Sequence, residues 1–451
     1  MTLPRRGVLG LVATLSLGCA VRGARAQDAY YWSETYGTYA TLLGGVVVGR
    51  VPDISASFYN PGRLAFATGP AISLTTKVYQ LSRLNIDINN TSYGSGEDLG
   101  STSVRPSPAF AAGVLPVGDS NKTVLAYSYL SRQSDDQRLN TTFQRPSSGP
   151  TPDNAEIFLQ RQASESWYGL SYSRRLNRRT GLGATLFGAY RSQFQRAEFS
   201  RQAPGTPPGA GEVVRQFDYY DFRLVVKAGF SSDFGPWSVG AVVTTPGLHI
   251  LGSGRILESQ TITDTVPPIS SFSDQDGLPA SYKSSWAFAF GVARNIDNVT
   301  IHATGEWFSP VDKYSVMDGA PIVPDDGRPP YDPDVIYQRQ SVFNGGISAQ
   351  VRRTATQSFY MFVKSDRSAR PKNTGVDVTL SRWGRFHVGG GYSFRLGQWD
   401  LVAGLAYMRG SDEYTAGESD NPPGGLEVPP GVTAKVTDSR LRFLFGFNVR
   451  L

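Results

Sequence analysis

The feature that most constrains this chain is a regular alternation of short and long connections between segments whose hydrophobicity repeats every second residue. Successive side chains of a β-strand point to opposite faces, so this period predicts strands with one apolar and one polar face. After the N-terminus, no run of apolar residues reaches the length that a membrane-spanning helix needs. The chain is therefore expected to be an all-β protein.

The periodicity predicts about fourteen strands, and the connections between them fall into two classes. The predicted strands lie near residues 71–87, 107–116, 122–132, 158–176, 180–196, 213–231, 237–254, 281–294, 298–311, 337–352, 355–366, 380–396, 398–410 and 432–451. Short connections lie near residues 118–121, 177–179, 233–236, 295–298, 353–354 and 397. Long connections, rich in Pro, Gly, Ser and Asp, lie near residues 88–106, 133–157, 197–212, 255–280, 312–336, 367–379 and 411–431.

This alternation indicates an up-and-down barrel, because every second connection in such a barrel lies at the same rim. Barrels of the bacterial outer membrane have an even number of strands, with short periplasmic turns and long extracellular loops. Residues 67–451 are accordingly expected to form a transmembrane antiparallel up-and-down β-barrel in the outer membrane of a Gram-negative-type bacterium, with both termini periplasmic. The alternative is a soluble β protein whose apolar faces form a packed core, and such a protein needs no alternation of loop lengths.

The two faces of the predicted strands differ as a membrane requires, because hydrocarbon can neither solvate an arginine nor bond a free strand edge. In the last strand, one face carries Leu441, Phe443, Phe445, Phe447, Val449 and Leu451, and the other carries Arg440, Arg442, Gly446, Asn448 and Arg450. In the eighth, Trp286, Phe288, Phe290 and Val292 oppose Ser285, Ala287, Ala289 and Gly291. Aromatic residues expected in the interfacial girdles are Tyr168, Trp237, Trp307, Trp383, Trp399 and Tyr407.

The end of the chain also predicts a partner. Apolar residues at every second position up to the C-terminus resemble the targeting signal that the barrel-assembly machinery recognises. Most such signals end in Phe, whereas this chain ends in Leu451.

The first 26 residues have the pattern of a cleaved signal peptide. Two arginines precede a mostly apolar stretch over residues 7–20, and a small-x-small site at residues 24–26 predicts cleavage before Gln27. The paired arginines leave a twin-arginine signal as an alternative, and Cys19 leaves a lipoprotein signal as another.

Cleavage would change the charge of the chain. The full sequence has 44 basic and 38 acidic residues, and the signal peptide holds four arginines and no acid, so the formal charge falls from +6 to 40 − 38 = +2. A nucleic-acid partner is therefore not expected. The single cysteine, Cys19, would be removed too, which suits an exported protein.

Residues 27–66 precede the first predicted strand and have poor strand character. A barrel of about fourteen strands encloses a lumen too wide for wall side chains to fill. We therefore expect residues 27–66 to form an N-terminal hatch, or plug, inside the barrel; the alternative is a short periplasmic helix or arm without a gating role.

One run in this segment carries a resemblance to a known family. The residues Ser57-Phe58-Tyr59-Asn60-Pro61-Gly62-Arg63-Leu64-Ala65 resemble the end of the hatch in the FadL/TodX family of outer-membrane transporters for long-chain fatty acids and hydrocarbons. That family usually has Asn-Pro-Ala, and Gly62 replaces the Ala here. The stretches 239–254 and 390–407 resemble barrel strands of the same family.

The resemblance implies a fourteen-stranded barrel with the hatch motif Asn60, Pro61 and Gly62 in its lumen. It also implies uptake of long-chain fatty acids or other hydrophobic compounds, which bind in the barrel and leave sideways into the surrounding lipid and lipopolysaccharide after the hatch moves. Two other functions stay open: a diffusion porin for polar solutes, and a structural or adhesive barrel with long surface loops.

A fatty acid needs a cation or a hydrogen-bond donor for its carboxylate. The predicted lumen-facing candidates are Arg223, Lys227, Arg440 and Arg442, and for each the alternative is an ion pair with a neighbouring acid such as Asp221 or Glu306.

No catalytic residue, metal site or cofactor is predicted. The three histidines, His249, His302 and His387, lie on separate strands. The sequence contains neither a Gly-x-Ser-x-Gly elbow nor a glycine loop followed by Lys-Ser/Thr. The chain is therefore not expected to be an enzyme.

Overall fold

The computed structural model describes residues 30–67, 71–88, 97–103, 107–117, 122–145, 153–203, 209–263, 268–324, 329–371, 383–415 and 433–450. The predicted signal peptide and Leu451 lie outside the described residues. Among the described residues, no helix is long and apolar enough to cross a membrane.

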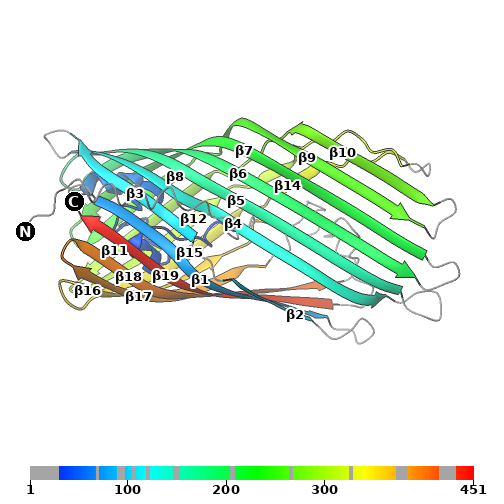
Figure 1. Cartoon of the computed structure of the whole chain (residues 1–451). Helices are drawn as coiled ribbons and strands as arrows, with labels where there is room; N and C mark the ends of the chain where they lie inside the picture. Colours follow the sequence, from blue (N-terminus) through cyan, green and yellow to red (C-terminus); the bar gives the residue numbers. More distant parts are fainter. Residues whose placement is uncertain are drawn as a thin grey trace, which may run out of the picture.

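The wall of the molecule is one antiparallel sheet of 17 labelled strands that closes on itself through the pairing of β1 with β19 (Figure 1). These strands are β1 (Ala71–Ile88), β2 (Glu97–Ser103), β3 (Ser107–Val117), β4 (Thr123–Arg145), β5 (Asp153–Arg175), β6 (Thr180–Ala203), β7 (Gly209–Phe234), β8 (Trp237–Thr244), β9 (Leu248–Ile262), β10 (Ile269–Pro279), β11 (Ala287–Ile296), β12 (Val299–Phe308), β15 (Val342–Arg352), β16 (Gln357–Asp366), β17 (Arg385–Leu396), β18 (Trp399–Thr415) and β19 (Thr433–Arg450).

Three strands of the wall are each divided into two labelled pieces. Strands β2 and β3 both pair with β1, and β8 and β9 both pair with β7. Strands β10 and β11 continue this arrangement by pairing with β9 and β8, respectively. The barrel therefore has 17 − 3 = 14 strands, all antiparallel, which confirms the fold predicted from loop alternation.

Each of the fourteen predicted strands corresponds to one wall strand, but several extend into segments for which loops were expected. Strand β2 lies within 88–106, and the end of β9 and all of β10 lie within 255–280. Strands β4 to β7 have 23, 23, 24 and 26 residues and include much of the segments 133–157 and 197–212, for which loops were expected. In Figure 1 these strands, together with β9 and β10, extend far beyond β11, β12 and β15 at the end away from the two termini. Their distal parts are rich in polar residues on both faces, so hydrophobic periodicity does not reveal them.

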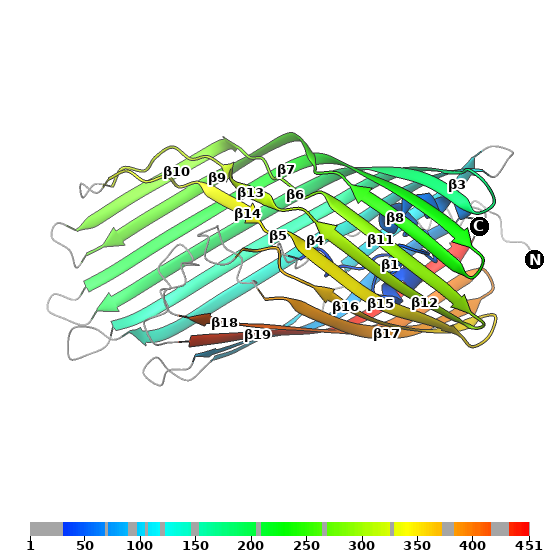
Figure 2. The same cartoon turned by 180° about the vertical axis from the view of Figure 1, so that it is seen from behind.

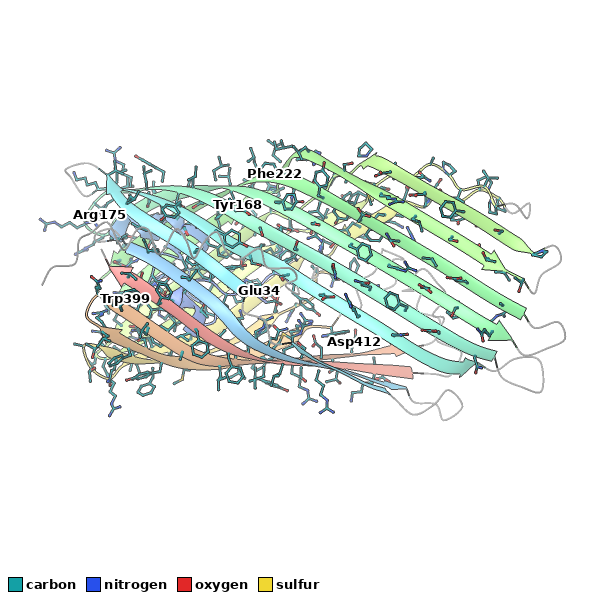
Figure 3. All side chains as sticks on the ribbon, viewed as in Figure 1. Glu34, Tyr168, Arg175, Phe222, Trp399 and Asp412 are labelled. Carbon is teal, nitrogen blue, oxygen red and sulfur yellow. The ribbon has the colours of Figure 1, made fainter. Side chains whose placement is uncertain are left out.

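The predicted inner and outer faces are confirmed. On β11, Phe288 and Phe290 are 50% and 58% exposed, whereas Ala287 and Ala289 are buried. Figure 3 shows aromatic side chains over the outer surface, including the labelled Tyr168 and Trp399. An outer surface that is apolar and aromatic requires lipid around it, because water would not solvate it.

One girdle residue was predicted wrongly. Trp383 is buried, and its backbone carbonyl accepts a hydrogen bond of 2.5 Å from the Tyr30 hydroxyl. Trp383 precedes β17 and is not part of the regular strand, so the alternation that holds within the strand does not determine where its side chain points.

The remaining elements lie inside this wall. The N-terminal segment, residues 30–66, contains α2 (Thr38–Leu42), α3 (Ala56–Tyr59) and the 3-10 helix η1 (Pro61–Phe66). A separate two-stranded sheet, β13 (Val311–Met317) with β14 (Val335–Arg339), occupies part of the predicted loop 312–336. Its buried side chains pack with residues of β7 and β9 in a cluster of Phe217, Tyr219, Ile256, Ala280, Tyr282, Val316, Met317, Val335 and Tyr337.

The lipid-facing role of the outer wall can be tested at Phe290. Replacing Phe290 with Arg should lower the stability of the barrel in lipid by roughly 2–4 kcal/mol if this position lies near the middle of the membrane. Urea titration of the protein folded in lipid vesicles measures the change. Phe290→Leu is the matched control and should have a much smaller effect; equal stabilities of the Arg and Leu variants would contradict the assignment of this face.

Candidate functional site

The N-terminal segment lies within the barrel, at the end where both termini are found (Figures 1 and 2). It is hydrogen-bonded to distant parts of the wall. The Thr185 hydroxyl on β6 donates to the Ser57 carbonyl at 2.7 Å, and the Ser348 hydroxyl on β15 donates to the Val46 carbonyl at 3.1 Å. These bonds reach opposite regions of the sheet, so the segment crosses the lumen.

A partly buried carboxylate organises the start of this segment. The carboxylate of Asp53 accepts hydrogen bonds from the backbone N–H groups of Tyr39 and Ala40, at 2.6 and 3.0 Å. These N–H groups belong to the first turn of α2, where a helix has no backbone acceptors for them. Burial raises the pKa of the Asp53 carboxyl above its usual range, and the hydrogen bonds oppose that shift.

The Asn60-Pro61-Gly62 run fastens the end of the segment to the wall. The Asn60 side-chain amide donates to the carbonyls of Val48 and Phe230, both at 2.9 Å, and its oxygen accepts from the Gly62 N–H. Asn60 is fully buried, so these bonds satisfy a polar group that would otherwise be costly to bury. The bond to Phe230 joins the segment directly to β7.

Gly62 has a steric reason to be glycine. A Cβ atom at this position would lie 2.6 Å from the carbonyl oxygen of Gly229 and 2.9 Å from that of Gly181, and both contacts are with wall backbone. The wall is equally close from its own side, because a Cβ at Gly183 would lie 2.4 Å from the Pro61 carbonyl oxygen. Gly62, which replaces the Ala of the Asn-Pro-Ala pattern, therefore lies where the backbone of the N-terminal segment comes very close to the backbone of the wall.

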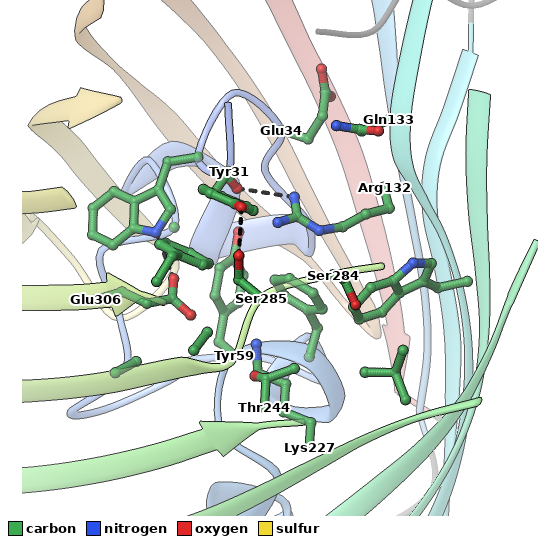
Figure 4. A pocket seen from close by; sticks show the side chains of 18 of the residues that line it. Tyr31, Glu34, Tyr59, Arg132, Gln133, Lys227, Thr244, Ser284, Ser285 and Glu306 are labelled. Carbon is green, nitrogen blue, oxygen red and sulfur yellow. Dashed lines mark hydrogen bonds between the residues drawn. The ribbon is translucent and has the colours of Figure 1, made fainter. Parts of the chain in front are cut away.

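A pocket with an open mouth lies between the N-terminal segment and the wall (Figure 4). Its lining residues come from the N-terminal segment, from several wall strands and from the irregular stretch before β11. They are Tyr31, Trp32, Glu34, Gly44, Gly45, Val48, Phe58, Tyr59, Arg132, Gln133, Glu165, Trp167, Val225, Lys227, Thr244, Thr245, Tyr282, Ser284, Ser285, Ala287, Ala289, Thr304, Glu306, Phe308 and Lys364.

Aromatic rings form much of this lining. Tyr31 stacks on Phe308 with ring centroids 3.8 Å apart, and Phe58 meets Trp167 edge-on at 6.2 Å. The ammonium of Lys227 lies 4.0 Å from the centroid of the Phe58 ring. The pocket thus offers apolar ring faces together with a small number of charged groups, the usual composition of a small-molecule site.

Of the four predicted lumen cations, Arg223 is ion-paired with two acids. It is almost completely buried, and its guanidinium lies 2.9 Å from both Asp221 and Glu165. Glu165 also pairs with Arg191 at 3.2 Å. For Arg223 the structure thus shows the alternative role, an ion pair with Asp221.

Arg440 and Arg442 lie on β19 and do not line the pocket. Arg440 pairs with Asp438 on the same face of its strand at 3.1 Å. Arg442 donates to the Ser33 carbonyl at 2.5 Å and lies 3.4 Å from Glu34, so it holds the start of the N-terminal segment.

Lys227 differs from these three arginines. Its side chain is buried and lines the pocket, and among the described residues no carboxylate is found within ion-pair distance of its ammonium. The structure therefore places only this one of the four predicted cations in the pocket lining.

Several pocket residues were missed by sequence analysis. Glu165 lies three positions before Tyr168 on a predicted strand, so the two side chains point to opposite faces. Because Tyr168 was expected on the outside, the inward position of Glu165 could have been inferred. Tyr282, Ser284 and Ser285 lie in an irregular stretch where alternation fails, so no such signal exists for them. Among the described residues, no group of three or more His, Cys, Asp or Glu side chains is placed to hold a metal ion.

The fold and the filled lumen define a transmembrane β-barrel of a recognisable type. No family model and no curated protein matches this sequence. Solved structures match over nearly their whole length: a Pseudomonas aeruginosa FadL homologue (TM-score 0.57, 13% identity, 94% of this chain and 100% of that one) and the P. putida toluene transporter TodX (0.60, 12%, 93% and 99%).

The Ralstonia pickettii toluene transporter TbuX is similar as well, with a TM-score of 0.53, 13% identity and coverage of 93% of this chain and 99% of that one. These similarities show the fold. The chain has a FadL/TodX-like fold, which confirms the resemblance drawn from the Asn60-Pro61-Gly62 run and the barrel segments.

The close seating of the Asn60-Pro61-Gly62 run can be tested with one methyl group. Gly62→Ala should lower the stability of the seated segment by about 1–3 kcal/mol, because the methyl meets wall backbone that cannot rotate away. Hydrogen–deuterium exchange of residues 56–66 should become faster.

The matched control is Gly384→Ala, since a Cβ there would meet no atom within 4 Å. Unchanged exchange in Gly62→Ala would show that the segment is not held by this contact.

Proposed function

We propose that this chain is an outer-membrane transporter for hydrophobic compounds. The observation that carries the proposal is the aromatic-lined pocket between the lumen segment and the wall of a closed, lipid-facing barrel. The neighbours of similar fold are described as a FadL homologue and as toluene transporters, and this supports the same class of cargo here. A non-catalytic role agrees with that class.

The chemistry of the pocket suits an amphiphile with a long apolar part. Burial of an apolar chain gains roughly 0.8 kcal/mol per CH₂, so a dozen such groups gain about 10 kcal/mol before the cost of ordering the chain. Phe58, Trp167 and Phe308 supply apolar contact surface.

Lys227 is the group that would bind a fatty-acid carboxylate. It is the one predicted candidate that lines the pocket, and no described carboxylate lies within ion-pair distance of it, although Glu306 lines the same pocket. Arg223 and Arg440 are instead paired with acids, and Arg442 holds the N-terminal segment. A buried cation beside a ring face gains from an anionic ligand, because the ligand supplies the missing countercharge.

The N-terminal segment would act as the hatch. It crosses the lumen and contributes Tyr31, Trp32 and Phe58 to the pocket, so a shift of this segment would change the shape of the pocket and free a bound ligand. The ligand would then leave sideways into the outer-membrane lipid. A porin for polar solutes is less compatible with this geometry, since its lumen needs a continuous aqueous path.

Assembly would follow the usual route of such barrels. We propose that β19, whose outer face is apolar and which closes the sheet against β1, is recognised by the barrel-assembly machinery. Both termini would then lie on the periplasmic side, with lipid and lipopolysaccharide around the wall.

The role of Lys227 predicts a selective loss of affinity. Lys227→Met keeps the length of the side chain but removes the charge, so binding of a long-chain fatty acid should weaken by about 1.5–3 kcal/mol, which is roughly ten- to a hundredfold in Kd. Binding of an alkane of the same length should change little. Isothermal titration in detergent measures both ligands.

Lys313→Met is the matched control, because Lys313 is an exposed lysine on β13 outside the pocket lining. If the unmodified protein, Lys227→Met and Lys313→Met bind the fatty acid with equal affinity, Lys227 does not bind the carboxylate.

The hatch role predicts the effect of deleting residues 27–66 from the mature chain. The barrel should still fold, since its ladders do not include this segment. Steady ion conductance across planar bilayers should rise because the lumen is no longer crossed, and saturable uptake of fatty acid should be lost. Conductance and uptake equal to those of the full chain would argue for an arm without a gating role.

A further inference from the structure

Several short connections of the wall lie side by side around the rim at which both termini are found (Figure 1). Backbone hydrogen bonds of 2.7–2.9 Å join each of these connections to the next one. The bonds run from the N–H groups of Arg175, Asp233 and Asn295 to the carbonyls of Lys122, Arg179 and Pro236, respectively. The end of β5 and the end of β11 therefore lie at the same rim.

Arg294, near the end of β11, is a cation in an apolar part of the outer wall. Val292 and Ile296 share its face, because they lie two positions away along the strand. Trp237 of β8 and Ile301 of β12 lie directly opposite it in the two adjacent ladders. Arg294 is exposed, and Ile296, Trp237 and Ile301 are 43%, 43% and 42% exposed. Apolar side chains therefore flank this cation on all four sides.

The protein supplies Arg294 with an aromatic ring but with no acid. The guanidinium carbon lies 4.9 Å from the centroid of the Trp237 ring. Among the described residues no carboxylate lies within ion-pair distance of the guanidinium, and this includes the exposed Asp297 of the following turn. Hydrocarbon cannot solvate an arginine, so the countercharge for Arg294 must come from outside the chain.

Arg174, near the end of β5, repeats this arrangement. It is exposed on the outer face, between Tyr172 and Leu176 along its strand and opposite Leu182 of β6. These three neighbours are 51%, 56% and 44% exposed. Across the other ladder it lies opposite Thr123 of β4. In the part of the chain that the structure describes, the Arg174 side chain has neither a hydrogen bond nor an ion pair.

Arg175, the next residue, shows what a partner within the protein looks like at this rim (Figure 3). Its guanidinium donates to the Ala65 carbonyl at 3.0 Å and lies 5.3 Å from the centroid of the Phe66 ring. Arg175 therefore holds the N-terminal segment from the inner face of the wall. Arg174 points to the other face, where the chain offers no comparable acceptor.

The turn between β5 and β6 adds two cations beside Arg174. The side-chain oxygen of Asn177 accepts hydrogen bonds from the N–H groups of Arg179 and Thr180, at 2.8 and 2.9 Å, and this shapes the turn. Arg178 and Arg179 are exposed, and no ion pair joins either of them to an acid of the described chain. The turn thus strengthens the positive potential at the outer face of the rim.

Partly exposed arginines in the distal strands are, by contrast, paired within the protein. Arg196 lies 2.8 Å from Glu198, and Arg255 forms an ion pair with Asp274 through two hydrogen bonds. Arginines without an acid on the outer face are therefore a local feature of the rim.

We propose that Arg294 with Trp237, and Arg174 with the β5–β6 turn, bind the phosphate groups of anionic glycerophospholipids that surround this rim. A guanidinium binds phosphate through two parallel hydrogen bonds. The apolar neighbours of each arginine contact the acyl chains of the same lipid. A phospholipid thus supplies both the countercharge and the apolar surface that these two sites require.

The choice of lipid follows from the leaflet. The proposal goes beyond the transport function, but it rests on the periplasmic position of the termini proposed above. The periplasmic leaflet of an outer membrane holds glycerophospholipids, whereas the outer leaflet holds lipopolysaccharide. A protein partner is a poorer occupant, because lipid surrounds the apolar neighbours of both arginines.

The first test measures which lipid stays on the protein. The protein is incubated in detergent with equal amounts of phosphatidylglycerol and phosphatidylcholine, and bound lipids are counted by native mass spectrometry. The unmodified protein should retain phosphatidylglycerol in preference, because the choline ammonium competes for the phosphate of its own lipid. Arg174→Gln with Arg294→Gln should lower the ratio of bound phosphatidylglycerol to phosphatidylcholine about tenfold or more.

Two controls separate the charge from the structure. Arg174→Lys with Arg294→Lys keeps both charges and should retain most of the preference. Arg255→Gln, which removes an arginine already paired with Asp274, should leave the ratio unchanged. Circular dichroism identifies the variants that are folded. An unchanged ratio in the folded double Gln variant would overturn the proposal.

The second test locates the lipid on the wall. Phosphatidylglycerol with a photoreactive diazirine in its headgroup is reconstituted with the protein and irradiated, and the crosslinked peptides are identified by mass spectrometry. Crosslinks should fall on residues 174–182 and 292–301 and should become several times weaker in the double Gln variant. Crosslinks only at the opposite end of the barrel, or equally strong in the variant, would contradict the assignment.

Two competitors identify the source of the phosphate. Excess inorganic phosphate should not displace phosphatidylglycerol, because it has no acyl chains to contact the apolar neighbours. Displacement by inorganic phosphate would show a free-anion site, and preferential binding of lipid A through the same arginines would place this rim in the outer leaflet. Either result overturns the proposal.

The lipid sites and the transport function can fail independently. Neither Arg174 nor Arg294 lines the pocket, so the double Gln variant should bind fatty acid as the unmodified protein does. A protein that binds no fatty acid but shows an arginine-dependent preference for phosphatidylglycerol would refute the transport function and leave the lipid sites standing.

Discussion

The constraint on which this structure depends is that hydrocarbon cannot hydrogen-bond a polypeptide backbone. A sheet that faces lipid must close so that every interior strand edge is paired, and its outer side chains must be apolar. The pairing of β1 with β19 meets the first condition, and the exposed aromatic and aliphatic side chains of strands such as β11 meet the second. Any place where neighbouring wall strands lack regular backbone hydrogen bonds therefore costs free energy.

Closure with fourteen strands creates the need for a lumen segment. Wall side chains alone do not fill such a barrel, so the space must hold water, a ligand or another part of the chain. Residues 30–66 occupy one end of it, and wall glycines such as Gly183 and Gly229 let the two backbones touch. The space that this segment leaves is the pocket, which makes the pocket a property of segment and wall together.

Charge within the lumen follows from the same closure. Arginines that face inward are shielded from water by the wall, so they are buried with acids, as Arg223 is with Asp221 and Arg440 is with Asp438. Lys227 lines the pocket without such an acid among the described residues, and this contrast is the physical basis for assigning it to an anionic ligand.

The sequence predicted the wall well because alternation reports directly on a face that meets lipid. Alternation was enough for the strand number and for the faces of β11 and β19. It missed the distal halves of β4 to β7, because a strand with water on both sides has no hydrophobic period.

The site was harder to predict for a related reason. Pairs two residues apart, such as Asp221 with Arg223, share a face and are visible in a sequence. The pairing of Arg223 with Glu165 depends on how distant strands come together, and the position of Tyr282 depends on an irregular stretch. Periodicity therefore proposed four equivalent cations, and only the three-dimensional structure distinguishes Lys227 from the others.

The central claim is that a hydrophobic ligand binds between the lumen segment and the wall. The most direct measurement is a crystal structure of the protein with a long-chain fatty acid brominated at its terminal carbon, in which anomalous scattering locates the bromine. The account predicts one bromine peak within the lumen, at the pocket bounded by Phe58 and Trp167, with the carboxylate at Lys227. A lumen without a peak, or peaks only on the outer surface of the barrel, would contradict it.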